Sequence, residues 1–203
     1  MKADPATSDK SRDEAREIKE KIIEAASRLY EEKGLYETSV AEIAELAGIS
    51  VPVTYHYVTR KSDILLLIME AFAGRFKERV RPPLEGLTDP VARLKTALRS
   101  YYTLVDEQLI KVVLVYRQSR ALDKAGRAKV MAAETETAKV FSDILQEGMD
   151  QGAFKRLDPD LVAYNVLTIG HAWALKNWHF RHRLSLDEYI GFQTDFILTA
   201  IRA

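Results

Sequence analysis

Cysteine is absent from this chain of 203 residues, which excludes disulfide bonds and cysteine-based metal sites. The N-terminus is charged and no apolar segment follows it, so we expect no signal peptide. The longest obvious apolar run, residues 64–69, is far shorter than the ~20 residues that a membrane-spanning helix needs. We therefore expect a cytoplasmic protein with no membrane partner.

Motifs for catalysis are missing as well, since no Gly-rich phosphate loop, nucleophile elbow or paired-acid pattern occurs. His179 and His182 have a spacing that suits two metal ligands on a helix. No carboxylate pattern supports them, so solvated or interfacial histidines are the simpler interpretation. Alternation of Val, Ile and Thr long enough for a sheet is also lacking. We expect an all-α protein that is not an enzyme, with no catalytic residues, metal or cofactor.

One stretch near the N-terminus has the start and stop signals of two short helices. Ser39 and Glu42 form a capping box, which satisfies free amides at a helix start. The apolar residues that follow recur at i, i+3, i+4 and i+7, until Gly48 permits a left-handed turn. Ser50 can cap the next helix, and Pro52 falls in its first turn, where no intrahelical donor is lost. This pattern predicts a helix-turn-helix, whose second helix enters the DNA major groove.

The particular residues of this stretch are more specific than the general helix-turn-helix pattern. It contains Ala47-Gly48-Ile49-Ser50, Tyr55-His56-Tyr57, and Lys61 with Asp63-Ile64-Leu65. With these residues, the segment 18–70 resembles the DNA-binding domain of the TetR family of one-component transcription regulators. The rest of the chain matches that family by length and helical character. The resemblance implies a homodimer that binds double-stranded DNA and encloses a pocket for a small-molecule effector.

The predicted DNA-binding surface departs from the family pattern in two places. Val51, Pro52 and Val53 stand where polar or small residues are more usual, and they can meet thymine methyl groups but form no hydrogen bonds to base edges. Arg60 stands where a small capping residue is common, which leaves Thr59 as the N-cap of the following helix. The residues expected to bind DNA are Thr38, Ser39, Ser50, Val51, Pro52, Val53, Thr54, Tyr55, Tyr57 and Lys61.

Charge is unusual for a DNA-binding protein, because Lys and Arg total 30 and Asp and Glu also total 30. Residues 46–62, however, hold no acidic side chain, while Arg60 and Lys61 are basic. We expect Lys61 to hold a phosphate, although it can also be a free surface lysine. Tyr55 and Tyr57 are either core aromatics or donors of a hydroxyl to phosphate. A locally acid-free face predicts specific binding with modest non-specific affinity.

The chain order suggests three parts and about nine helices. Residues 1–12 are expected to be a disordered arm, 13–80 a helix-turn-helix DNA-binding domain whose fourth helix (60–79) links the two domains, and 81–203 the effector-binding and dimerisation domain. Helices are expected at 13–33, near 107–122, at 124–150, at 159–180 and from Ser185 to about 201, the last opened by a second capping box. Asp89 or Thr88 is expected to cap a further helix that starts at Pro90.

The last two predicted helices are rich in aromatic and histidine residues, more than one domain can easily bury. Pairing of two helices with their copies in a four-helix bundle would cover them. The residues expected at this dimer interface are Tyr164, His171, Trp178, Phe192 and Phe196.

Polar groups embedded in otherwise apolar helix faces mark the expected effector pocket. They are Tyr102, Tyr116, Arg117, Arg120 and His171. An anionic lipophilic ligand such as a fatty acyl thioester fits this composition, whereas the arginines can instead lie at the surface or pair with Asp123, Glu134 or Glu136. We expect a ligand-responsive regulator, a repressor rather than an activator, on a palindromic operator. The alternative is a helical-bundle lipid carrier or enzyme that does not use the helix-turn-helix.

Overall fold

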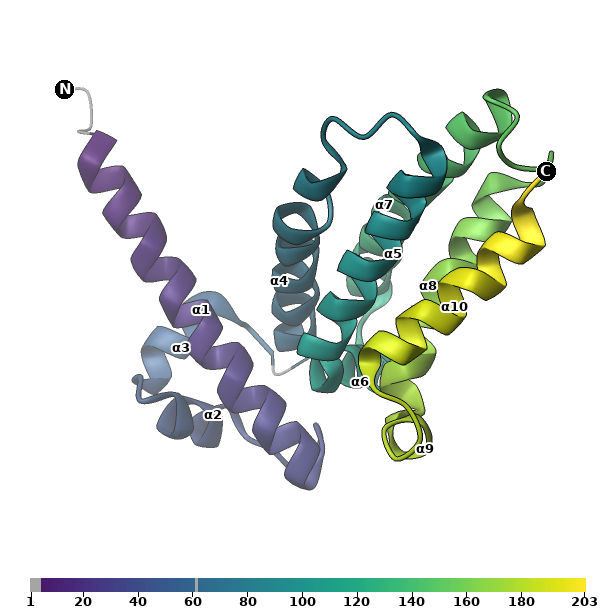
Figure 1. The fold of residues 1–203 in the computed structure, drawn as a ribbon. Helices are drawn as coiled ribbons and strands as arrows, with labels where there is room; N and C mark the ends of the chain where they lie inside the picture. The colour runs from purple at the N-terminus through teal and green to yellow at the C-terminus, as the bar shows by residue number, and fades with distance from the viewer. Residues whose placement is uncertain (1–4, 61) are drawn as a thin grey trace. The chain divides into compact units, whose positions relative to one another are not determined.

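A computed structural model of the chain describes residues 5–60 and 62–203, and the side chains among them from residue 13 onwards. Across these residues the regular structure is helical, with no strand, and this confirms the all-α prediction (Figure 1). No helix in the described part of the chain is both long and apolar enough to cross a bilayer. The helices fall into two compact units, and each is described by itself below.

The first unit contains residues up to Met69 together with Leu114–Arg127. Its helices are α1 (Pro5–Lys33), α2 (Val40–Ala47), α3 (Val51–Tyr57) and the start of α4 (Asp63–Arg79). Helix α2 packs against both α1 and α3 (Figure 1). The small core of the first unit is formed by Ile22, Ala26, Tyr30, Leu35, Ile43, Ala44, Val58, Ile64 and Leu65. Because α2 and α3 are only 8 and 7 residues long, they depend on this packing for stability.

The second unit contains Glu70–Val113 and Ala128–Ala203. Its helices are the rest of α4, α5 (Pro90–Glu107), the start of α6 (Leu109–Gln118), most of α7 (Lys124–Asp150), α8 (Pro159–Leu175), α9 (Asn177–Phe180) and α10 (Leu186–Ile201). Helix α5 packs against both α8 and α10. The core is aromatic at its centre, where the Tyr101 ring lies 5.5 Å from the Phe141 ring and 5.9 Å from the Phe76 ring.

Several boundaries match the sequence predictions. Gly34 and Gly48 follow α1 and α2 with φ of 87° and 66°, the left-handed conformation that ends helices. Asp89 caps α5 by accepting backbone N–H groups of Val91 and Ala92, and Pro90 follows it. The predicted capping box of α10 is present at Ser185 and Glu188.

Other boundaries differ from the predictions. Helix α1 already begins at Pro5, so it extends into the segment expected to be a disordered arm; residues 1–4 lie outside the described part. The compact units divide within α4 and α6, not at the segment 81–89. The helix expected over 159–180 ends at Leu175, and the short α9 follows. This break lets the Phe180 ring stack on Trp173, with an interplanar angle of 8°.

Candidate DNA-binding surface

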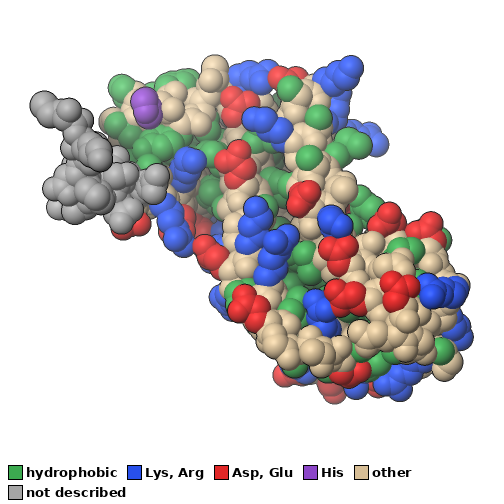
Figure 2. Space-filling model, turned by 90° about the horizontal axis from the view of Figure 1, so that it is seen from above, with side chains coloured by type: hydrophobic (Ala, Val, Ile, Leu, Met, Phe, Trp, Pro, Cys, Tyr) green, Lys and Arg blue, Asp and Glu red, His purple; other side chains and the backbone are tan. Residues whose placement is uncertain are grey.

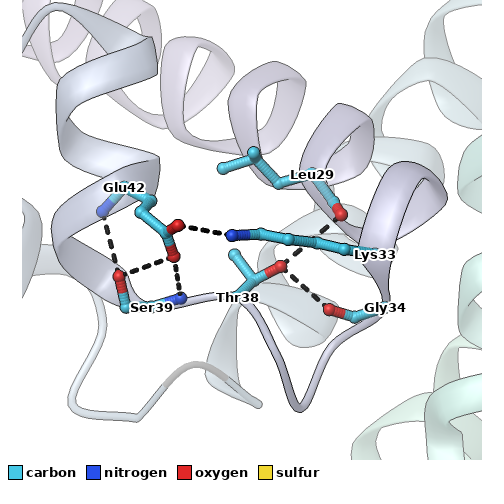
Figure 3. A network of polar contacts seen from close by, with 6 residues as sticks. All are labelled: Leu29, Lys33, Gly34, Thr38, Ser39 and Glu42. Atoms are coloured by element: carbon cyan, nitrogen blue, oxygen red, sulfur yellow. Dashed lines mark hydrogen bonds and ion pairs between the residues drawn. The ribbon is translucent and has the colours of Figure 1, made fainter.

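The start of α2 is fixed by the capping box that the sequence predicted. The Ser39 hydroxyl oxygen accepts the Glu42 N–H at 3.2 Å, and the Glu42 carboxylate accepts the Ser39 N–H at 2.8 Å (Figure 3). Lys33, in the last turn of α1, forms an ion pair with the same carboxylate. Hydrogen bonds from Lys33 and Ser39 lower the pKa of Glu42 to about 2. The two helices are thereby joined by one carboxylate that stays charged.

Thr38 serves this scaffold and is not available to DNA. Its side chain is buried, and its hydroxyl donates to the carbonyl oxygen of Gly34 at 2.8 Å (Figure 3). The prediction that Thr38 contacts DNA is therefore wrong for this conformation, since a buried hydroxyl that is already bonded has no group to offer. The Ser39 hydroxyl is likewise engaged, although Ser39 itself is exposed at the start of the helix.

Helix α3 presents an exposed face with few polar groups. Val51, Pro52, Val53, Tyr55 and His56 are exposed, and Tyr57 is half-buried. The exposed fraction is 37% for each valine and 54% for Tyr55, which leaves these side chains free to meet a partner. An α-helix with exposed side chains along its first turns suits insertion into a major groove.

Two predictions for α3 need correction. Ser50 precedes the helix in an extended conformation, but its side chain forms no capping hydrogen bond. Thr54 is fully buried, and its hydroxyl donates to the carbonyl oxygen of Ser50 at 3.3 Å. Thr54 therefore cannot read bases, because it lies on the face of α3 that packs into the core. Because α3 is only seven residues long, the spacing of its apolar residues does not show which side chains face the core and which face outward.

The turn between α3 and α4 is stabilised by the carboxylate of Asp63, the first residue of α4. Helix α4 begins at Asp63, three residues later than predicted, and Thr59 is not its N-cap. Instead, Asp63 Oδ2 accepts the backbone N–H groups of Thr59 at 3.2 Å and Arg60 at 2.9 Å. Lys61 lies outside the described residues, so its contact with phosphate remains a prediction.

His56 is a candidate contact that the sequence predictions missed. It is the basic residue in the last turn of α3, and no acidic residue occupies the first turn of that helix. Its ring lies edge-on to Tyr57, with centroids 5.6 Å apart. The signal was present in the sequence as the one ring nitrogen donor within the acid-free residues 46–62. Elsewhere, blue and red side chains are interspersed over the face seen in Figure 2, in agreement with the net charge of zero.

The second unit contains a buried polar group at its centre. The Tyr101 hydroxyl lies 2.7 Å from His171 Nε2, and the Tyr102 hydroxyl donates to the Val166 carbonyl oxygen at 3.0 Å. Burial lowers the pKa of His171 to about 4 and raises the pKa of Tyr102. These groups are therefore neutral near pH 7. Of the predicted effector residues, Tyr102 and His171 are buried in this core, and Tyr101 joins them.

The other predicted effector residues lie at the surface. Tyr116, Arg117 and Arg120 are exposed, which contradicts the expectation of positive charges held in an apolar interior. Helix α6 ends at Gln118, and a 3₁₀ helix, η2 (Ser119–Ala121), carries Arg120. The two arginines therefore do not share one α-helical face, as their spacing had suggested.

Exposed aromatic residues gather on the last helices, as expected for a dimer interface. The exposed fractions are 70% for Phe192, 60% for Phe196 and 71% for Trp178, whereas Tyr164 is 40% exposed. His171 is only 9% exposed and faces the core, so its assignment to this interface is wrong. Leu161, 63% exposed on α8, adds a further apolar side chain to the set.

Two family models match the chain over most of its length. Residues 22–68 match the model described as "Bacterial regulatory proteins, tetR family". Residues 87–198 match the model described as "Tetracyclin repressor-like, C-terminal domain". Together these matches cover the helix-turn-helix, helices α5 to α9 and most of α10.

Individual proteins agree with the family models. The transcriptional regulator HbdR from Aromatoleum sp. (strain CIB) is 34% identical over 174 residues, which cover 86% of this chain and 76% of HbdR. The repressor KstR2 from Mycobacterium tuberculosis (strain ATCC 25618 / H37Rv) is 24% identical over 160 residues, 78% of this chain and 79% of KstR2. The crystal structure of AibR with isovaleryl coenzyme A and operator DNA has a TM-score of 0.74 at 23% identity, and covers 88% of this chain and 97% of AibR. That last likeness concerns the fold.

Proposed function

The chain belongs to the TetR family of DNA-binding transcriptional regulators, and we propose that it acts in the cytoplasm as a homodimeric repressor released from a palindromic operator by an acyl thioester. The observation that carries the DNA-binding part is the exposed, acid-free face of α3 on a scaffold fixed by the capping box of α2. An enzyme or lipid carrier would have no use for this arrangement. HbdR and KstR2, named as transcriptional regulators, support the same function.

A dimer explains how so short a recognition helix gains affinity. Two copies of α3 related by a two-fold axis read two half-sites about one helical turn of DNA apart, ~34–36 Å, or a multiple of it. A palindromic operator follows from this symmetry. We propose that Tyr164, Trp178, Phe192 and Phe196 form the interface, since their exposure in one chain requires a cover.

Direct readout is expected to be apolar at the start of α3. Val51 and Val53 offer methyl groups, which match the C5-methyl of thymine. We therefore expect selection from a random duplex pool to enrich a palindrome with a thymine at a fixed position in each half-site. Val53→Ala should lower the preference for that thymine about four- to fifteenfold, because each lost methyl contact contributes ~0.8 kcal/mol.

The matched control for this experiment is Val130→Ala, which makes the same chemical change on α7, in the second unit. It should leave the enriched sequence unchanged. Enrichment of no palindrome by the unaltered protein would contradict the proposed function and favour a carrier.

The effector proposal rests on the chemistry of the buried polar group. Tyr102 and His171 are neutral, and they lie with Tyr101 among aromatic rings; the ring centroids of Phe72 and Phe76 are 6.5 Å and 5.9 Å from that of Tyr101. A ligand part that reaches them is expected to be uncharged, such as an acyl chain whose thioester carbonyl accepts a hydrogen bond. AibR, which was crystallised with isovaleryl coenzyme A, supports this ligand class.

We expect isovaleryl coenzyme A or a longer acyl coenzyme A to raise the melting temperature and to release the selected duplex, whereas coenzyme A alone does neither. At ~100-fold above Kd the stabilisation approaches ~2.7 kcal/mol. Tyr101→Phe should weaken the response, because it removes the hydroxyl that faces His171 Nε2. Tyr189→Phe, which removes a buried hydroxyl bonded to the Ile169 carbonyl, is the control. An unchanged response of Tyr101→Phe would exclude this hydroxyl as a ligand contact.

A further inference from the structure

A charged contact joins the turn after the recognition helix to a distant segment of the same compact unit. Arg60 Nη2 lies 2.8 Å from Asp123 Oδ2, although 63 positions separate the two residues. Arg60 follows α3, and Asp123 precedes α7 within the segment Leu114–Arg127. None of the predicted DNA contacts includes either residue.

Asp123 is held in place by a second interaction of its carboxylate. Its Oδ1 atom accepts the backbone N–H of Gly126 at 2.8 Å, as an N-cap residue does at the start of a helix. Arg127 Nη1 donates to the carbonyl oxygen of Leu122 at 2.7 Å, which closes the same turn from the other side. The hydrogen bond from Arg60, followed by that from Gly126, lowers the pKa of Asp123, so the carboxylate stays charged. Its position is thus set by α7 and not by Arg60 alone.

Arg60 is held at both ends. Its backbone N–H donates to Asp63, and its guanidinium also lies 3.4 Å from Asp63 Oδ1. The guanidinium therefore bridges Asp63, which shapes the turn after α3, and Asp123, which caps α7. A shift of the segment that carries Asp123 would be transmitted to this turn through the contacts of Arg60 with Asp123 and with Asp63.

We propose that Asp123 is a positioning residue for DNA recognition, which acts through Arg60 to hold the turn after α3 in the geometry that DNA binding needs. The inference rests on the proposed DNA-binding function and adds a residue outside the helix-turn-helix to it. The segment with Asp123 continues from α6, whose first part belongs to the second unit.

The decisive variant is Asp123→Asn, because asparagine caps a helix about as well as aspartate does but carries no charge. Its affinity for the duplex selected by the unaltered protein should fall about two- to fivefold per subunit, the range for an exposed ion pair. Its melting temperature should fall by no more than about 2–4 °C, and the slope of log K against log salt should stay unchanged. Asp123→Ala removes the cap as well and should lower the melting temperature too. Asp143→Asn, which breaks the Lys139 pair on α7 at 2.9 Å, should leave DNA binding unaffected.

A double-mutant cycle with Arg60→Gln tests whether Asp123 acts through Arg60. If it does, adding Asp123→Asn to Arg60→Gln costs no further affinity. Independent effects that multiply would overturn the proposal. An Asp123→Asn variant that binds as well as or more tightly than the unaltered protein would overturn it too, the latter by showing that Asp123 withholds Arg60 from phosphate. Failure of the unaltered protein to select any duplex would instead contradict the proposed function.

Discussion

Replacement of both Phe192 and Phe196 by glutamate is expected to convert the protein into a folded monomer that no longer binds its operator. The two rings are four residues apart on α10, so they share one helix face, and they are 70% and 60% exposed. Each buried phenylalanine contributes ~1.5–3 kcal/mol. In a two-fold interface each substitution occurs twice. The loss of dimer affinity should therefore exceed a thousandfold, before the cost of burying four carboxylates is added.

Sedimentation velocity at micromolar concentration measures this effect, and circular dichroism checks that the monomer remains helical. Ile110→Glu is the matched control, since Ile110 is 39% exposed on α6 and lies outside the aromatic set. It should stay dimeric and bind DNA normally. A double glutamate variant that sediments as a dimer would show that another face forms the interface.

The second large effect is expected at Gly148, where a single added methyl group has no room. A Cβ atom there would lie 2.1 Å from Cδ2 and 2.3 Å from Cε2 of Phe154. Phe154 is buried, and its backbone N–H donates to the Gly148 carbonyl at 3.1 Å, so its ring is held over this residue. Gly148→Ala must displace the ring, and such overpacking costs ~1–3 kcal/mol. This exceeds the ~0.5–1 kcal/mol that alanine gains over glycine inside a helix.

Urea unfolding of Gly148→Ala should accordingly show a lower midpoint than that of the unaltered protein. Gly74→Ala is the control, because Gly74 lies within α4 and a Cβ there would meet no atom within 4 Å. That variant should be as stable as the unaltered protein or more stable. Equal stability of the two variants would mean that the Phe154 ring moves aside at no cost.

Many helix boundaries of this protein are determined by residues that are close together in the sequence. The capping boxes at Ser39 and Ser185 involve residues three positions apart, and the left-handed Gly48 needs only its own lack of a side chain. The acid-free residues 46–62 are likewise a property of the sequence. For these reasons the helix-turn-helix was predictable. The resemblance to the family came from particular residues, such as Ala47-Gly48-Ile49-Ser50, and not from these patterns.

Tertiary structure decided which side chains are available. Thr38 and Thr54 were predicted from the sequence to contact DNA, yet packing buries both side chains, and each hydroxyl donates to a backbone carbonyl oxygen. Arg117 and Arg120 are exposed, and α6 ends between them, which their spacing does not reveal. The pairing of Arg60 with Asp123 joins residues 63 positions apart. Such contacts depend on how helices meet in space, because burial and pairing are set by neighbours that are distant in the sequence and not by the pattern of each helix.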